Sequence, residues 1–220
     1  MKIGVFDSGI GGLSVANAIE KALPEHHIIF MNDQQHVPYG SKSLAEIEQY
    51  AFPIFEALVY RGCEVIVVAC NTVSMLLIKK LRAHFDVPFI ALEPMVKPAA
   101  EATKTGVIAV CATPATLASQ RYAELKTTYA KDIKIIEPDC SDWSYMIEHK
   151  TVDDQKIRAR VTSTLAKNAD VIVLGCTHYH WIEKEIKEVV GDRAQVIQPE
   201  QATIKQLKRV IEKVREARAV

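Results

Sequence analysis

The stretch Val65-Ile66-Val67-Val68-Ala69-Cys70-Asn71-Thr72 has a counterpart 106 residues further on, Val171-Ile172-Val173-Leu174-Gly175-Cys176-Thr177-His178. Each is a continuous run of aliphatic, mostly β-branched residues that ends in a cysteine and two polar residues. Such runs are typical of strands buried on both faces of a parallel sheet that helices cover. In open α/β sheets ligands bind at the carboxyl ends of the strands. The two stretches therefore predict an α/β fold with a cysteine at each ligand-binding edge.

A second, weaker repeat accompanies the first. Ile3-Gly4-Val5-Phe6-Asp7-Ser8 resembles the segment 105–110, which is followed by Cys111-Ala112-Thr113, at an offset of about 103. Chance similarity of buried strands is the alternative for either match alone, but two matches at nearly the same offset indicate a duplicated α/β half. The halves are then about 1–93 and 94–200, with the last helix packing back on the first half. We predict one domain of residues 1–93 plus 205–220 and a second of residues 94–204.

Short apolar runs alternate with longer amphipathic segments along the whole chain. Strands are predicted near 2–6, 27–31, 64–69, 88–91, 106–111, 133–137, 170–174 and 194–197, and helices near 11–22, 43–60, 73–85, 94–103, 115–130, 152–168, 180–190 and 201–218. Strand–helix alternation of this kind indicates βαβ units. The predicted fold is α/β, with two pseudo-symmetric, doubly wound parallel-sheet domains and the active site in the cleft between them.

The composition is that of an ordinary globular protein of 220 residues. Lys and Arg equal Asp and Glu at 27 each, so no net field draws the chain to nucleic acid or to a membrane, although a local basic patch stays open. We see no signal peptide, and the apolar runs are far shorter than the ~18 residues that span a bilayer. Five cysteines, an odd number, indicate free thiols in a reducing cytoplasm.

Cys70 and Cys176 carry the chemistry that the sequence suggests. Moving a proton from one face of a carbon α to a carboxylate to the other needs a base on one side and an acid on the other. A free thiol has a pKa near 8.5, so thiol and thiolate are both accessible near neutral pH. Two thiols across a cleft therefore suit inversion without a cofactor. A structural cysteine is the alternative, and we prefer it for Cys63, Cys111 and Cys140.

The segment Asp7-Ser8-Gly9-Ile10-Gly11-Gly12-Leu13-Ser14 joins the first predicted strand to the first helix. Its glycines permit a tight turn and leave N–H groups free to meet an anion at the start of the helix. The spacing matches neither the dinucleotide-binding nor the P-loop pattern. A substrate carboxylate would therefore serve as well as a nucleotide phosphate, and a plain capped turn is the remaining alternative. Asp7 lies where a carboxylate can hydrogen-bond a thiol or a substrate ammonium.

Further polar residues follow the strands. Asn71-Thr72 and Thr177-His178 come directly after the two cysteines and can hydrogen-bond carboxylate and ammonium groups, and Thr113 and Thr116 extend this set from the second half. His178 could act on the thiol of Cys176 or on the substrate. A Cys-x-His pair could also begin a zinc site, but no second pair at ligand spacing appears, so we expect no metal.

With these residues assembled, the chain resembles the glutamate racemase family of the aspartate/glutamate racemase superfamily over nearly its whole length. Aspartate and hydantoin racemases share the two-cysteine plan, but their first glycine loop and the residues after their second cysteine differ from those here. The motifs that carry the resemblance, in family order, are Phe6–Leu13, Pro38-Tyr39-Gly40, Ala69–Thr72, Glu93-Pro94 with Lys97-Pro98-Ala99, Trp143–Glu148 and Leu174–Tyr179.

The resemblance implies a cofactor-independent racemase, usually a homodimer, with glutamate held between two domains. One cysteine acts as thiolate base and the other as thiol acid, with the roles exchanged by direction. Asp7 would support Cys70, while His178 and Glu148 would support Cys176. The product, D-glutamate, is a building block of bacterial peptidoglycan. The residues that would hold the substrate are Ser8, Pro38, Tyr39, Gly40, Asn71, Thr72, Thr113, Thr116 and Thr177.

Some positions depart from the family pattern. Gln34-Gln35 stands where small residues are common, Ala112 where glycine is usual, His180 where proline is usual and Gln198 where aspartate is common. The chain also ends sooner after Gln198 than typical members do. Two alternatives to glutamate racemisation stay open. One is a racemase of the same superfamily acting on another acidic amino acid, such as aspartate. The other is a non-catalytic binding protein on this fold, since some family members are reported to inhibit DNA gyrase; a binding module would need neither Cys70 nor Cys176.

Overall fold

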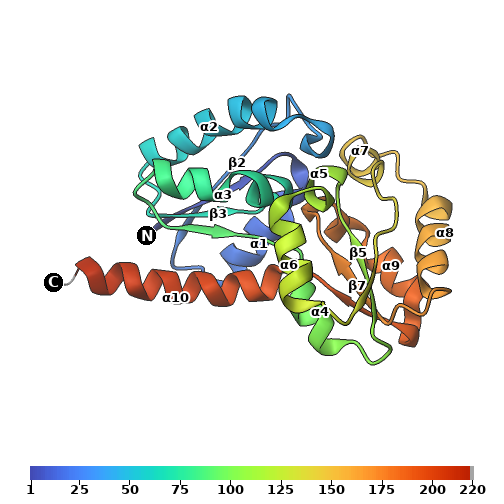
Figure 1. Cartoon of the computed structure of the whole chain (residues 1–220). Coiled ribbons are helices and arrows are strands. Elements are labelled where there is room, and N and C mark those ends of the chain that lie inside the picture. The colour runs from blue at the N-terminus through green and yellow to red at the C-terminus, as the bar shows by residue number, and fades with distance from the viewer. Residues whose placement is uncertain (219–220) are drawn as a thin grey trace.

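The structure, a computed structural model, describes residues 1–218. Within this range the chain forms eight strands in two parallel four-stranded sheets (Figure 1). The first sheet has the order β2-β1-β3-β4 and the second the order β6-β5-β7-β8. The strands are β1 (Lys2–Asp7), β2 (His27–Asn32), β3 (Val65–Val68), β4 (Phe89–Ala91), β5 (Val107–Cys111), β6 (Lys134–Ile136), β7 (Val171–Leu174) and β8 (Gln195–Ile197).

The two sheets repeat one topology. β1 pairs in parallel with β2 and β3, and β5 pairs in the same way with β6 and β7. The two matching cysteine stretches are therefore β3 and β7, at equivalent places. The register corrects the pairing of 3–8 with 105–110 by three residues, because Ile3 lies beside Val65 and Ile108 beside Val171. The sequence match had aligned Gly4-Val5 with Gly106-Val107, which made the offset between the two halves too small. The predicted pseudo-symmetric α/β fold is confirmed.

Helices cover both faces of each sheet, as in a doubly wound fold. On the first sheet, α2 (Leu44–Tyr60) and α3 (Asn71–His84) pack on one face, while α1 (Leu13–Ala22) and α10 (Glu200–Arg218) pack on the other. On the second sheet, α4 (Val96–Ala102) and α6 (Gln120–Tyr129) cover one face. The other face is covered by α7 (Trp143–Glu148), α8 (Asp154–Leu165) and α9 (Glu183–Val190). The remaining helical turns are α5 (Pro114–Leu117), η1 (Ile10–Gly12), η2 (Tyr39–Ser41), η3 (Thr177–Ile182) and η4 (Gly191–Arg193).

Most predicted elements lie within a few residues of their observed positions, and three helical segments differ. The predicted helix 115–130 is two helices, because the side chain of Ser119 accepts the N–H of Tyr122 and begins α6 after α5 has ended. The short helix α7 was not among the predicted helices. The predicted helix 180–190 begins at Glu183, because the preceding residues form the 3-10 turn η3.

The last helix crosses back to the first sheet. Although α10 follows β8 of the second sheet, its residues Ile204, Leu207 and Ile211 are buried against β1, β3 and β4, and the helix runs along the first half toward the C-terminus (Figure 1). This packing supports the division into residues 1–93 plus 205–220 and residues 94–204, which we keep as a proposal. Residues 219–220 of that division lie outside the described range.

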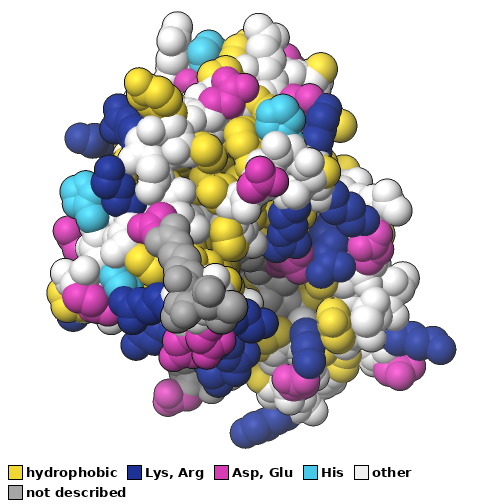
Figure 2. Space-filling view, turned by 90° about the vertical axis from the view of Figure 1, so that its left-hand side faces the viewer, with side chains coloured by type: hydrophobic (Ala, Val, Ile, Leu, Met, Phe, Trp, Pro, Cys, Tyr) yellow, Lys and Arg dark blue, Asp and Glu magenta, His cyan; other side chains and the backbone are white. Residues whose placement is uncertain are grey.

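The surface agrees with the balanced composition. On the face that Figure 2 shows, Lys and Arg side chains are interspersed with Asp and Glu side chains. None of the helices within residues 1–218 is long and apolar enough to cross a membrane.

Candidate active site

The two cysteines lie at the carboxyl ends of equivalent strands. Cys70 follows β3 and precedes α3, and Cys176 follows β7 and precedes η3. Both are buried, with 5% and 7% of their surface exposed. They are close enough that a charge on Cys176 raises the pKa of Cys70. The fold thus brings the two thiols into one site between the sheets.

The surroundings of Cys70 favour the thiol form. Burial raises the pKa of Cys70 to about 12, and the carboxylate of Asp7 contributes to the rise. The Oγ of Ser8 accepts a hydrogen bond from the Cys70 Sγ at 3.5 Å, which acts in the opposite direction. At neutral pH Cys70 therefore carries its proton.

Asp7 holds the glycine loop and also accepts a hydrogen bond from the second half. Its Oδ2 accepts the N–H groups of Gly9 (3.1 Å) and Gly12 (3.0 Å), and its Oδ1 accepts the hydroxyl of Thr177 (3.0 Å). A Cβ on Gly12 would lie 2.3 Å from the Cβ of Asp7, so this approach requires glycine. Burial raises the pKa of Asp7, and its hydrogen bonds and the charge of His178 only partly offset that.

Cys176 has a different partner. The Nδ1 of His178 lies 3.8 Å from the Cys176 Sγ, and its Nε2 lies 2.5 Å from Oε2 of Glu148. Burial lowers the pKa of His178, but the hydrogen bonds with Cys176 and Glu148 outweigh it and bring the pKa to about 10. Burial raises the pKa of Glu148, and hydrogen bonds from His178 and Gln34 together take it below its usual range. The result at neutral pH is an imidazolium–carboxylate pair beside the thiol.

Three threonine hydroxyls meet where the two halves are in contact. Thr72, at the start of α3, lies 3.0 Å from Thr113 and 3.4 Å from Thr116, and Thr113 lies 3.1 Å from Thr116. All three are buried. Asn71 donates from Nδ2 to the carbonyl of Leu92, while its buried Oδ1 has no partner among the described residues. The N-terminus of α3 thus offers hydroxyls, amides and one free acceptor.

The Pro38-Tyr39-Gly40 segment approaches the second half. A Cβ on Gly40 would lie 2.7 Å from the Cβ of Thr113, so glycine lets the two halves touch here. The Tyr39 ring is buried, and its hydroxyl donates to Oδ2 of Asp33 at 2.7 Å. Burial and then Asp33 raise the pKa of Tyr39. The segment therefore shapes the edge of the site mainly through its backbone.

Sequence reasoning missed two contacts between the halves, both at positions that depart from the family pattern. Gln34 donates from Nε2 to Oε1 of Glu148, and the Nδ1 of His180 lies 3.1 Å from the hydroxyl of Ser14. Burial, followed by the charge of His178, lowers the pKa of His180 to about 4, so it is neutral. The unusual residues at positions 34 and 180 could have drawn attention to these contacts, but one sequence does not say which residue each of them faces.

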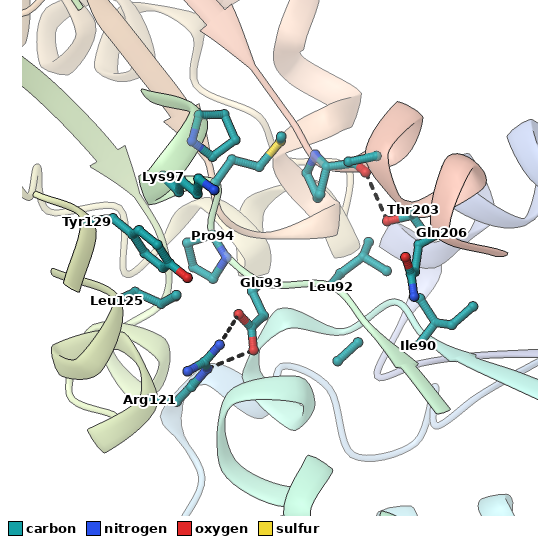
Figure 3. A pocket seen from close by; sticks show the side chains of 15 residues that line it. Ile90, Leu92, Glu93, Pro94, Lys97, Arg121, Leu125, Tyr129, Thr203 and Gln206 are labelled. Atoms are coloured by element: carbon teal, nitrogen blue, oxygen red, sulfur yellow. Dashed lines mark hydrogen bonds and ion pairs between the residues drawn. The ribbon is translucent and has the colours of Figure 1, made fainter. Parts of the chain in front are cut away.

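A separate cavity of about 290 Å³ lies outside the cysteine site. It is bounded by the end of β4, α4, α6 and α10, and Arg121 forms a bidentate ion pair with Glu93 at its rim, with both N–O distances 2.9 Å (Figure 3). Neither cysteine lines it. Within residues 1–218 no group of three His, Cys, Asp or Glu side chains is placed to hold a metal ion.

Comparisons with known proteins agree with this geometry. The model of the Asp/Glu/Hydantoin racemase family matches residues 3–207. The glutamate racemase of Herpetosiphon aurantiacus is 38% identical over 213 residues, which cover 95% of this chain and 84% of that protein. The crystal structure of Escherichia coli glutamate racemase with L-glutamate and the activator UDP-MurNAc-Ala superposes with a TM-score of 0.89 at 31% identity, covering 96% of this chain and 82% of that one.

A third relative was solved with the other enantiomer. Glutamate racemase from Francisella tularensis in complex with D-glutamate is 30% identical, with a TM-score of 0.80, and the match covers 96% of this chain and 81% of that one. The predicted resemblance is confirmed: the chain belongs to the Asp/Glu/Hydantoin racemase family and, within it, to the group of glutamate racemases.

Proposed function

We propose that this protein interconverts L- and D-glutamate without a cofactor, using Cys70 and Cys176 as the two proton-transfer groups. The observation that carries the proposal is the meeting of two buried thiols, from equivalent ends of two sheets, in one site. The solved relatives with L-glutamate and with D-glutamate supply the choice of substrate.

The reaction moves one proton off Cα and another onto its opposite face. In one direction the thiolate of Cys176 removes the α-proton, and the thiol of Cys70 delivers its own proton to the other side; the reverse direction exchanges these roles. The donated N–H of protonated His178 stabilises negative charge on the Cys176 sulfur, and Glu148 keeps that imidazole protonated and oriented. Each turnover leaves the proton on the other sulfur, so proton exchange between the thiols and solvent resets the pair.

Cys70 needs help to act as a base. Burial and Asp7 disfavour its thiolate. A substrate ammonium placed beside Asp7 and Cys70 would offset the negative charge of the Asp7 carboxylate. It would also favour the thiolate of Cys70, because an opposite charge nearby stabilises the charged form. The free Oδ1 of Asn71 is an acceptor for the same ammonium.

The substrate carboxylates would lie against donors at the cleft. Asn71 and Thr72 present backbone N–H groups at the start of the 14-residue helix α3, where the helix favours negative charge. The hydroxyls of Thr113, Thr116 and Thr177 face this region from the second half. We assign Ser8, Pro38, Tyr39 and Gly40 to the wall of the pocket in the first half.

Family membership leads to the remaining parts of the proposal. We propose that the D-glutamate produced serves peptidoglycan synthesis, that the enzyme acts in the cytoplasm and that it works as a homodimer. The five cysteines are all free and buried, which suits a reducing compartment.

The test is circular dichroism of L-glutamate incubated with the purified protein and no added cofactor. We expect the signal to decay to zero, and we expect the D-glutamate formed in D₂O to carry deuterium at Cα, because the delivering thiol exchanges with solvent. Aspartate is run in parallel. If the circular dichroism signal decayed faster with aspartate, aspartate would be the preferred substrate instead of glutamate. A constant signal with both amino acids would reject the racemase proposal.

A further inference from the structure

The carboxylate of Glu148 is held by donors from both halves of the molecule. Its Oε2 accepts the N–H of Ile10 at 3.2 Å and contacts the Nε2 of His178 at 2.5 Å. Its Oε1 accepts the Nε2 of Gln34. Glu148 and His178 belong to the second half, whereas Ile10 and Gln34 lie in loops that follow β1 and β2. The Glu148 side chain is only 2% exposed, whereas Gln34 is an exposed residue that reaches the carboxylate from the surface.

The two carboxylate oxygens differ in how they are fixed. Oε2 has two partners, while Gln34 is the one donor to Oε1 among the described residues. Gly9 lies close on the same side, since a Cβ there would be 2.5 Å from Oε2 of Glu148. The carboxylate therefore has little room to shift, and the Gln34 amide sets its rotation against the imidazole of His178.

We propose that Gln34 is a positioning residue for racemisation, which orients Glu148 on His178 and thereby tunes the Cys176 side of the reaction. This inference rests on the proposed function. Gln34 follows β2 of the first half and Glu148 lies in the segment after β6 of the second, so their contact joins the two halves. Removing it is expected to lower kcat more than to raise KM, because glutamate itself is held by other groups.

Gln34→Glu and Gln35→Glu form a matched pair of variants. Gln35 is exposed and makes no hydrogen bond or ion pair with the described residues, so its variant adds the same charge one position away. The carboxylate introduced by Gln34→Glu would face Glu148 directly, and two carboxylates that share a site cannot both ionise readily. The other titratable groups around the pair are His178 from η3, Asp7 from β1, His149 beside Glu148, and Asp33 and His36 beside Gln34.

The experiment measures kcat and KM for L-glutamate with both variants between about pH 8.5 and pH 5.5. At the alkaline end we expect kcat of Gln34→Glu to lie about tenfold or more below that of Gln35→Glu, as misplacement of a supporting group usually costs. As the pH falls, the carboxyl introduced at position 34 takes up a proton and becomes a donor to Oε1 of Glu148, so the ratio of the two kcat values should approach one. A ratio that stays constant with pH would overturn the inference.

Thermal unfolding of the same two variants provides a reading without turnover. Glu148 raises the pKa of the carboxyl introduced at position 34 in the folded state, so the folded state becomes less favourable as the pH rises. The melting temperature of Gln34→Glu should therefore be lower than that of Gln35→Glu at about pH 8.5, and the two should be equal at about pH 5. Equal melting temperatures at every pH would overturn the contact itself. A pH-dependent gap in a protein that does not racemise glutamate would reject the proposed function and leave the contact standing.

Discussion

The two halves of the molecule place their cysteines at equivalent strand ends but surround them with different charges. Cys70 has the carboxylate of Asp7 nearby, and its hydrogen-bond partners are the hydroxyl of Ser8 and the backbone N–H of Val73. Cys176 has the imidazole of His178, whose pKa of about 10 keeps it cationic at neutral pH. One thiol therefore faces a group that disfavours its thiolate, and the other faces a group that stabilises it.

The register of the sheets shows where this difference arises. Since Ile3 corresponds to Ile108, Asp7 corresponds to Ala112 and Ser8 to Thr113. The second half thus lacks an acid at the end of its first strand and gains Glu148 on α7, in the segment after β6. The duplicated framework sets where the thiols meet, and the loops after the strands set their protonation.

The largest expected effect comes from removing either sulfur. Cys70→Ala and Cys176→Ala should each lower racemisation of both enantiomers by at least ~10²–10⁴-fold, because each direction needs one acid and one base. Circular dichroism started from L- and from D-glutamate measures this. Cys63→Ala is the control, since Cys63 lies in the core of the first half and behaves as a small apolar residue.

The two alanine variants also distinguish the role of Cys70 from that of Cys176. In the proposed scheme each variant retains the sulfur for one face of Cα. Exchange of the α-hydrogen with D₂O should therefore persist for one enantiomer only, and for the opposite enantiomer in the other variant. Proton NMR of the α-position follows this exchange. Near wild-type racemisation by either alanine variant would contradict the paired-thiol scheme.

The next effect concerns the cation beside Cys176. Glu148→Gln removes the charge that holds His178 protonated, and we expect kcat to fall about 10²-fold. The exposed Glu188, paired with Arg158, gives the control Glu188→Gln, which should keep full activity. If Glu148→Gln matched that control, the pair would have no part in supporting Cys176.

This pair also makes stability depend on pH with a defined sign. The pKa of His178 rises from 6.5 to about 10 in the folded state, so its contribution is fully present below about pH 6.5 and is lost as the pH rises toward 10. Glu148 has a lowered pKa, so its contribution is lost as the pH falls below its usual value near 4.5. Melting temperatures from pH 5 to about pH 10 should therefore decline toward the alkaline end in the wild type and decline less in His178→Asn. Equal slopes would contradict the assignment.

The sequence predicts the strands of this fold better than it predicts helix boundaries and contacts between distant residues. The strands were predictable because buried parallel strands are continuous apolar runs, such as Val65–Val68 and Val171–Leu174. The break at Ser119 was not, since a serine inside a helical pattern becomes a cap only when its side chain turns to Tyr122. The six-residue helix α7 is too short for periodicity to reveal, and tertiary packing stabilises it.

Individual site residues were predictable where they end strands, and their pairings were not. Asp7, Cys70 and Cys176 stand at strand ends, where the fold brings side chains together. Glu148 was named through family resemblance alone, and its contact with Gln34 joins positions 114 residues apart. Such a contact depends on how far the two halves close, which no local pattern encodes.

A smaller effect is expected at the acid beside Cys70. Asp7→Asn keeps the acceptor for Gly9 and Gly12, and the hydroxyl of Thr177 can turn to accept from the new amide. Removing the negative charge should lower the pKa of Cys70, because Asp7 raises it. The pH dependence of Cys70 alkylation, followed by mass spectrometry, should shift to lower pH. An unchanged profile would show that Asp7 acts on the loop alone.

The smallest expected effect tests the one hydrogen bond that Cys70 makes to a side chain. The Oγ of Ser8 favours the thiolate, so Ser8→Ala should raise the pKa of Cys70 and lower kcat by about fivefold, the worth of one hydrogen bond of about 1 kcal/mol. The relative loss should be the same at every pH well below the Cys70 pKa, because a raised pKa lowers the thiolate fraction by one constant factor there. The control Ser74→Ala removes another buried hydroxyl, one that donates to the Val68 carbonyl at 3.0 Å, and should cost stability without this loss of kcat. An equal loss in both variants would mean that Ser8 contributes packing only, and the electrostatics of the Cys70 side would then rest on Asp7 and the substrate ammonium.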